Sequence, residues 1–167
     1  VQFINLFSPV KGEVVMIPSC KTIPLSMPVI SGNEWKYVKD CLDTGWVSSA
    51  GSYVTRFEEV VADYVGTKYA VATVNGTSAL HVSLITCGVQ PNDEVIVSTL
   101  TFIAPVNVIH YCNAYPVFMD CVADSMCIDV QKVVDFLGNE CEQRSNGYTY
   151  NKDTNRRIKA VIPVHVF

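Results

Sequence analysis

Charged side chains are scarce in this sequence. Asp, Glu, Lys and Arg make up 17% of its 167 residues, against about 25% in an average soluble domain. The formal net charge is -4, from 12 basic and 16 acidic residues. This composition excludes a disordered chain and a basic nucleic-acid-binding protein. Because 49% of the residues are hydrophobic, we expect one core and an apolar surface that contacts a partner subunit or a further part of the protein.

Paired cysteines are also missing. The chain has 7 cysteines, an odd number, and no Cys-x-x-Cys spacing. The closely spaced Cys and His ligands that a structural zinc site requires do not occur either. We therefore expect a reduced, cytoplasmic protein without a metal. The first residues show no basic start, long apolar stretch or cleavage site, so we expect no signal peptide.

Uninterrupted hydrophobic runs and hydrolase motifs are absent as well. Residues 69–92 and 95–119 carry no charged side chain, but Asn75-Gly76 breaks the first stretch and two prolines break the second. Buried strands and helices explain these stretches better than a membrane span. Neither Gly-x-Ser-x-Gly nor His-Glu-x-x-His occurs, so nothing in the sequence specifies hydrolysis.

The hydrophobic pattern predicts helices that alternate with strands. Helical spacing of apolar residues, followed each time by a glycine, predicts the first two helices. Alternation of helices and strands then indicates a parallel sheet covered by helices. The polar stretch 138–157 is expected to lie on the surface and to contain a small hairpin. The predicted order is helix 35–44, helix 53–65, strand 69–74, helix 79–88, strand 94–98, helix 101–113, strand 116–120, helix 129–137 and strand 159–167.

The sharpest local signal is VNGTSAL at 74–80. A strand that enters a helix through Gly76, Thr77 and Ser78 presents free backbone N–H groups and two hydroxyls at the positive end of the helix. A phosphate group fits such a turn. Ordinary N-capping by Thr77 or Ser78, which stabilises a helix by about 1 kcal/mol, is the competing interpretation, and on these residues alone it is favoured.

Further candidates lie at the ends of predicted strands. Phe102 follows one strand, where its ring could stack on a planar ligand, and core packing is the competing interpretation. His165 lies at the matching edge of a later strand, where an imidazole could touch a cofactor. The acidic residues at strand ends, Asp93, Glu94 and Asp120, are expected to cap loops rather than to act as bases.

Four segments carry a resemblance to a known family. They are GNEWKYVKDCLDTGWVSSAGSYVTRFEE, DYVGTKYAVATVNGTSALHVSL, GVQPNDEVIVSTLTFIAPVNVIHYCNAYPVFMD and YNKDTNRRIKAVIPVHVF. In this order, from Ile23 to Phe167, they resemble the DegT/DnrJ/EryC1/StrS family of pyridoxal-phosphate-dependent aminotransferases, which aminate keto groups on nucleotide-linked sugars. The last segment, with its charged insert, resembles the branch that aminates UDP-linked 4-keto-6-deoxy sugars towards bacillosamine or legionaminic acid.

The resemblance implies an α/β fold, namely part of the large domain of a fold-type I aminotransferase, with a mostly parallel sheet and helices on both faces. Residues 1–22 are then an irregular amino-terminal segment, and 23–167 are the amino-terminal portion of the cofactor-binding domain. The Schiff-base lysine and the aspartate that pairs with the pyridine nitrogen are expected beyond Phe167. No catalytic residue is therefore assigned within this chain, which we do not expect to be active alone.

The resemblance also implies roles for residues at matching positions. The turn resembles the family's phosphate-holding turn, Phe102 resembles the aromatic residue that stacks on the pyridine ring, and His165 resembles a residue of the pocket wall. The loop TGWVSSAG resembles a segment near the sugar site. The candidates are Gly76, Thr77, Ser78, Phe102 and His165 for pyridoxal 5'-phosphate, and Trp46 and Ser48 for the substrate.

The implied reaction is a ping-pong transamination, in which an amino group passes from a donor, usually glutamate, through the cofactor to the sugar ketone. Family members are homodimers, so a second copy of the chain is an expected partner. We expect neither a nucleic acid nor a membrane as a partner. One alternative is a non-catalytic binding or scaffolding remnant of the family that lacks the lysine. Another is an unrelated nucleotide-binding module.

Overall fold

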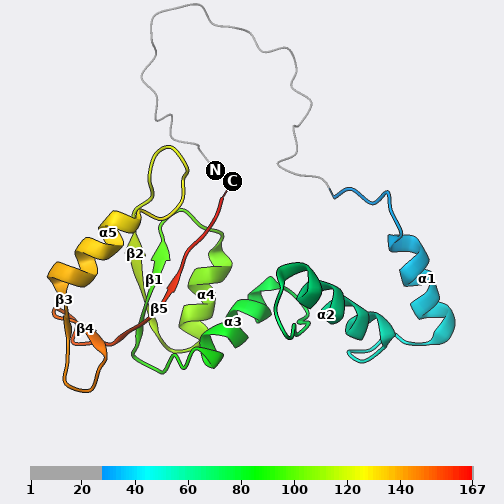
Figure 1. Cartoon of the computed structure of the whole chain (residues 1–167), viewed down its shortest axis with the longest axis horizontal. Helices are drawn as coiled ribbons and strands as arrows, with labels where there is room; N and C mark the ends of the chain where they lie inside the picture. The colour runs from blue at the N-terminus through cyan, green and yellow to red at the C-terminus, as the bar shows by residue number, and fades with distance from the viewer. Residues whose placement is uncertain (1–27, 167) are drawn as a thin grey trace, which may run out of the picture. The chain divides into compact units, whose positions relative to one another are not determined.

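A computed structural model describes residues 28–166 of the chain (Figure 1). The expected irregular segment 1–22 lies outside these residues. The chain divides into two compact units, 1–50 and 51–167. The described part of the first unit contains helix α1 (Glu34–Thr44). The second contains α2 (Ser52–Val65), α3 (Gly76–Thr86), β1 (Glu94–Ser98), α4 (Ile103–Tyr111), β2 (Tyr115–Met119), α5 (Val130–Asp135), the π-helical turn η1 (Phe136–Glu140), β3 (Cys141–Gln143), β4 (Thr149–Asn151) and β5 (Ile158–Ile162).

Helices α1 and α2 confirm the two helices predicted first. Each ends at a glycine whose φ lies in the left-handed region, 75° at Gly45 and 72° at Gly66. Glycine adopts this conformation without the steric cost of a Cβ, so both residues end their helices as the sequence pattern indicates.

The central sheet is parallel, with the strand order β2-β1-β5. Strand β1 lies in the middle and is buried along its whole length. Its pairing with β5 shifts at the amino end, because Glu94 is opposite Ile158 while Val95 is opposite Ala160. Lys159 is thus an extra residue in β5, as in a β-bulge.

Both faces of this sheet are covered, as expected. Val95 and Val97 of β1 pack with Val108 of α4 in a cluster that α3 completes through Leu84. Ile96, which points to the other face, packs with Phe136 at the end of α5. Figure 1 accordingly shows α4 and α5 on opposite sides of the three strands. The expected α/β architecture with helices on both faces is confirmed.

The polar stretch 138–157 contains the hairpin that we expected. Strands β3 and β4 pair antiparallel, with Cys141 opposite Asn151. Gly147, at a φ of 81°, makes the turn between them. The hairpin is joined to the sheet through Asn151, whose side-chain amide donates to the buried carboxylate of Glu94 at 2.9 Å.

Two predicted strands differ from the structure. Residues 69–74 form no strand, and Tyr69, Val71 and Val74 are 74%, 80% and 88% exposed. A strand needs a hydrogen-bonded neighbour, and this segment pairs with none of the described strands. The strand predicted over 159–167 is shorter, since β5 ends at Ile162. Pro163 follows, and proline has no N–H to continue a ladder.

Candidate cofactor site at the carboxyl edge of the sheet

The carboxyl ends of β1 and β5 lie beside each other and border a hollow of about 250 Å³. Ligands of open α/β sheets bind at this edge of the strands. Two of the residues singled out from the sequence, Phe102 and His165, are on the wall of this hollow. Its full lining is Leu100, Thr101 and Phe102 after β1, and Val164, His165 and Val166 after β5.

Phe102 lies immediately before α4, in an extended conformation with φ -64° and ψ 156°. Phe102 is 78% exposed, so it does not pack in the core that the described residues form. An aromatic ring this exposed has a free face on which a planar ring can stack.

Two buried hydroxyls belong to this edge of the sheet, and one of them, on Thr101, comes from a residue that lines the hollow. The Oγ of Ser98, the last residue of β1, and the Oγ1 of Thr101 have no hydrogen-bond partner among residues 28–166. Buried polar atoms are nearly always hydrogen-bonded in folded proteins. The exposed aromatic ring of Phe102 and the imidazole of His165 on the wall of the hollow fit a planar, polar guest such as a pyridine ring with its substituents.

A loop that follows β2, residues 120–128, reaches the same edge of the sheet. Cys121 pairs with Ile128 in an isolated antiparallel bridge, so that the loop closes on itself. The Sγ of Cys121 lies 3.8 Å from Thr99 Oγ1, and the Sγ of Cys127 lies 4.0 Å from His165 Nδ1. The loop therefore contacts the residues that follow both β1 and β5.

The turn at Gly76, Thr77 and Ser78 forms the first residues of α3. The helix is capped by Asn75, whose Oδ1 accepts from the Ser78 amide at 2.9 Å. The expected capping by Thr77 or Ser78 was therefore wrong, because the helix begins at Gly76 and places both residues inside its first turn. The amides of Gly76 and Thr77 belong to the first turn and have no acceptor within the helix. None of these three residues lines the hollow.

The two residues expected near the sugar, Trp46 and Ser48, follow α1 in the first unit. Both are exposed, and the Trp46 side chain is 61% accessible. Their assignment to a substrate site stays a prediction.

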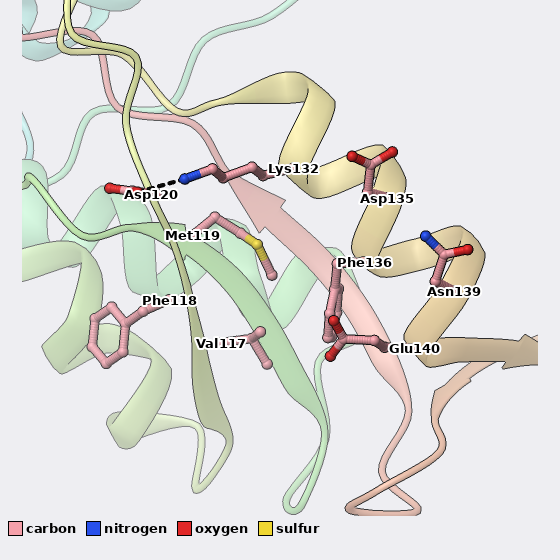
Figure 2. A pocket seen from close by; sticks show the side chains of 9 residues that line it. All are labelled: Val117, Phe118, Met119, Asp120, Lys132, Asp135, Phe136, Asn139 and Glu140. Carbon is pink, nitrogen blue, oxygen red and sulfur yellow. Dashed lines mark hydrogen bonds and ion pairs between the residues drawn. The ribbon is translucent and has the colours of Figure 1, made fainter.

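A second hollow, of about 540 Å³, lies between β2 and α5 (Figure 2). Val117, Met119 and Phe136 line its apolar part, and polar side chains such as Asn139 and Glu140 line the rest. The sequence contained no sign of this hollow, because it forms only where α5 passes into the π-helical turn η1 beside β2.

An ion pair joins the two sides of this second hollow. Lys132 Nζ donates to Asp120 Oδ2 at 2.6 Å, and the Cys121 amide donates to Asp120 Oδ1 at 3.0 Å. The hydrogen bond from Lys132 is the main cause that lowers the pKa of Asp120, and the same bond raises the pKa of Lys132. Asp120 thus holds a loop end, as we expected, and also joins β2 to α5.

No group of three or more His, Cys, Asp or Glu side chains in the described part of the chain could hold a metal ion. None of the helices described is both long enough and apolar enough to cross a membrane.

Solved structures identify the class of protein to which this fold belongs. A DegT DnrJ EryC1 StrS aminotransferase from Brucella abortus matches 77% of this chain with 31% of its own, at a TM-score of 0.64 and 28% identity. NtdA from Bacillus subtilis, solved with its bound cofactor PMP, matches 79% of this chain with 26% of its own, at a TM-score of 0.60 and 25% identity. The fold is that of a pyridoxal-phosphate-dependent aminotransferase, in part.

The sequence assigns the family. The profile of the DegT/DnrJ/EryC1/StrS aminotransferase family matches residues 28–167, and the chain belongs to this family. Members of the family and their structural neighbours bind pyridoxal phosphate or its amino form. The resemblance of the four segments to this family is thus confirmed.

Curated relatives carry names from sugar biosynthesis. The GDP-perosamine synthases of Vibrio cholerae and Escherichia coli O157:H7 are 39% and 40% identical over 145 and 147 residues, which are 87% and 88% of this chain. The spore coat polysaccharide biosynthesis protein SpsC of Bacillus subtilis is 36% identical over 143 residues, 86% of the chain. The chain spans about a third of the length of these relatives, 35%, 36% and 32% respectively.

Proposed function

We propose that this chain is the amino-terminal portion of an aminotransferase that uses pyridoxal phosphate to aminate a keto group of a nucleotide-linked 4-keto-6-deoxy sugar. The observation that supports the proposal most directly is the exposed ring of Phe102, which lines the same hollow as His165 at the carboxyl edge of the parallel sheet in a chain of this aminotransferase family. That edge is where α/β proteins bind their ligands. The names of the relatives, which include a GDP-linked and a UDP-linked amino sugar, support the substrate class.

In this proposal the chain binds and orients the cofactor. Phe102 stacks on the pyridine ring, and His165 forms the wall beside it. The amides of Gly76 and Thr77, with the hydroxyls of Thr77 and Ser78, hold the phosphate at the positive end of α3. The bound cofactor supplies an electron sink for the transfer of the amino group.

The remaining parts of the proposal rest on the family resemblance. Trp46 and Ser48 contact the sugar nucleotide, glutamate is the amino donor, and the protein is a cytoplasmic homodimer. The lysine that binds the cofactor covalently and the aspartate that pairs with its pyridine nitrogen belong to the protein beyond this chain. The intact mass of the native gene product tests this last point. A mass a little over twice that of the chain supports the enzyme, whereas a mass equal to that of the chain supports the non-catalytic alternative.

The substitution Phe102→Ala tests the cofactor site in the full-length protein. We expect the affinity for pyridoxal phosphate, followed by absorbance titration, to fall about two- to tenfold, because stacking contributes roughly 0.5–1.5 kcal/mol. The unfolding temperature should change little, since the ring is exposed. Tyr64→Ala removes another exposed aromatic ring, from α2, and serves as the control. Equal affinity in the Phe102 variant and the parent would remove Phe102 from the site.

A further inference from the structure

One side chain beside the cofactor hollow has a role that the sequence did not indicate. Cys127 lies on the loop after β2, and its Sγ is 4.0 Å from Nδ1 of His165. The two residues are 38 positions apart in the sequence, so this contact results from the fold. His165 lines the hollow and Cys127 does not. The thiol therefore contacts the imidazole from outside the space that a ligand would occupy.

The loop itself is constrained at several points, so the thiol has a defined place. The amide of Val122 donates to the carbonyl of Cys127 at 3.0 Å, and the amide of Cys127 is held by Ser125 Oγ at 3.3 Å. At the base of the loop, Asp129 donates from its amide to the carbonyl of Asp120 at 2.8 Å. Met126 adopts a positive φ of 56°. A loop tied in this way can act as a support for a neighbouring side chain.

By contrast, His165 belongs to an irregular segment after β5. Its ring is not fixed by a strand ladder, and its orientation depends on contacts of the ring itself. An imidazole has two distinct nitrogens, and the hydrogen bond made by one determines what the other presents. A thiol is a weak donor, and a neutral imidazole nitrogen accepts a hydrogen bond. When Nδ1 is held by Cys127, Nε2 is the nitrogen left for a molecule in the hollow.

We propose that Cys127 is a positioning residue of the cofactor site: its thiol donates to Nδ1 of His165 and so orients the imidazole with Nε2 available to the bound ring. This inference rests on the proposed function only for the identity of the ligand. The contact between thiol and imidazole, and its effect on the ring, can be tested without any cofactor.

The first measurement is nitrogen NMR of the full-length protein labelled with ¹⁵N in its histidines. The signals of His165 are assigned by their loss in His165→Asn. In the parent we expect one tautomer, with Nδ1 as the acceptor and the proton on Nε2. Cys127→Ala should give signals averaged between the two tautomers. Cys127→Ser, which keeps a donor at nearly the same place, should restore the parent pattern. Identical His165 signals in the parent and in Cys127→Ala would overturn the proposal.

The second measurement is the dissociation constant of pyridoxal phosphate for the same variants. We expect Cys127→Ala to weaken binding about two- to tenfold, as for the loss of one neutral hydrogen bond, and Cys127→Ser to remain within about twofold of the parent. Cys87→Ala is the control, because Cys87 is an exposed cysteine at the end of α3 and not part of this hollow. Weakening by Cys127→Ser as large as by Cys127→Ala would contradict the hydrogen bond.

The two measurements separate this inference from the proposed function. A parent protein that does not bind pyridoxal phosphate contradicts the proposed function, while its NMR signals still decide whether Cys127 orients His165. A parent protein that binds the cofactor, with unchanged affinity and unchanged His165 signals in Cys127→Ala, contradicts the positioning role and leaves the proposed function intact.

Discussion

Strand β1 begins with buried carboxylates that are hydrogen-bonded and ends with a buried hydroxyl that has no partner in the described part of the chain. At the amino end, Asp93 and Glu94 are 5% and 2% exposed. Arg157 donates to both oxygens of Asp93, at 2.8 and 2.5 Å. Glu94 accepts from Asn151 at 2.9 Å and from Thr154 at 2.7 Å. At the carboxyl end, Ser98 is fully buried and its Oγ is unpaired.

The two edges of the sheet thus differ in whether their polar groups are hydrogen-bonded within the chain. The amino edge satisfies its polar groups within the chain, since buried charges are strongly destabilising when they lack partners. At the carboxyl edge, the hydroxyls of Ser98 and Thr101 have no partner among residues 28–166, and the ring of Phe102 is exposed. Hydrogen-bonded polar groups are thus concentrated at one end of β1, and the exposed ring of Phe102 lies just beyond the other.

The largest expected effect is the loss of the ion pair at the amino edge. Arg157→Leu leaves the charge of Asp93 buried without its partner, so we expect the free energy of unfolding in denaturant to fall by about 3–5 kcal/mol. The additional change Asp93→Asn should recover much of this loss. Lys39→Met is the control, because Lys39 and its partner Asp43 are 57% and 59% exposed and such pairs contribute roughly 0–1 kcal/mol. Equal losses in Arg157→Leu and Lys39→Met would show that burial of the pair has no effect.

The next largest expected effect is the difference in the free energy of unfolding between two variants that each lose a hydroxyl, one at either end of β1. Thr154→Val removes a hydrogen bond to the buried Glu94 carboxylate, and we expect a loss of about 1.5–3 kcal/mol in the free energy of unfolding. Ser98→Ala removes a buried hydroxyl without a partner, so stability should be unchanged or rise by up to about 1 kcal/mol. Comparable losses in the two variants would mean that Ser98 is hydrogen-bonded in solution, and the contrast between the two edges would disappear.

The smallest expected effect concerns the exposed ion pair between Asp120 and Lys132. Because Lys132 lowers the pKa of Asp120, the pair stabilises the fold above the carboxyl's ordinary value of about 4 and is lost as the pH falls through the lowered pKa. The unfolding temperatures of the parent and of Lys132→Met should therefore differ slightly at neutral pH and converge in acid. High salt should also reduce the difference, since both side chains are exposed. A difference that grows in acid would contradict this assignment.

The fold was predictable from the sequence where the signal is local. Strand 94–98 was predicted with its exact bounds, because an apolar run between turn residues has few alternatives. The segment 69–74 has a similar run, yet it forms no strand, since strand formation depends on a neighbour that periodicity cannot reveal. Likewise the cap of α3 is Asn75 rather than a hydroxyl of the turn, because a residue's capping role depends on where the helix begins.

The candidate site was predictable only in part. Phe102 and His165 could be selected because residues that follow parallel strands meet at one edge. Their partners could not be selected in the same way. Cys127, which contacts His165, is separated from it by 38 residues in the sequence. Such contacts depend on how loops close around the sheet, which the spacing of residues along the chain does not show.

The extra residue Lys159 in β5 bears on how this fold tolerates change. Before this extra residue in the chain, Ile158 pairs with Glu94 of β1. After it, Ala160, Val161 and Ile162 pair in register with the next three residues of β1. The whole hairpin insert precedes this shift in the chain. Changes of length at the tip of the hairpin, residues 144–148, can therefore be absorbed before Ala160, without displacing the residues that lead to His165. The base of the hairpin has no such freedom, because Asn151 is bonded there to the buried carboxylate of Glu94.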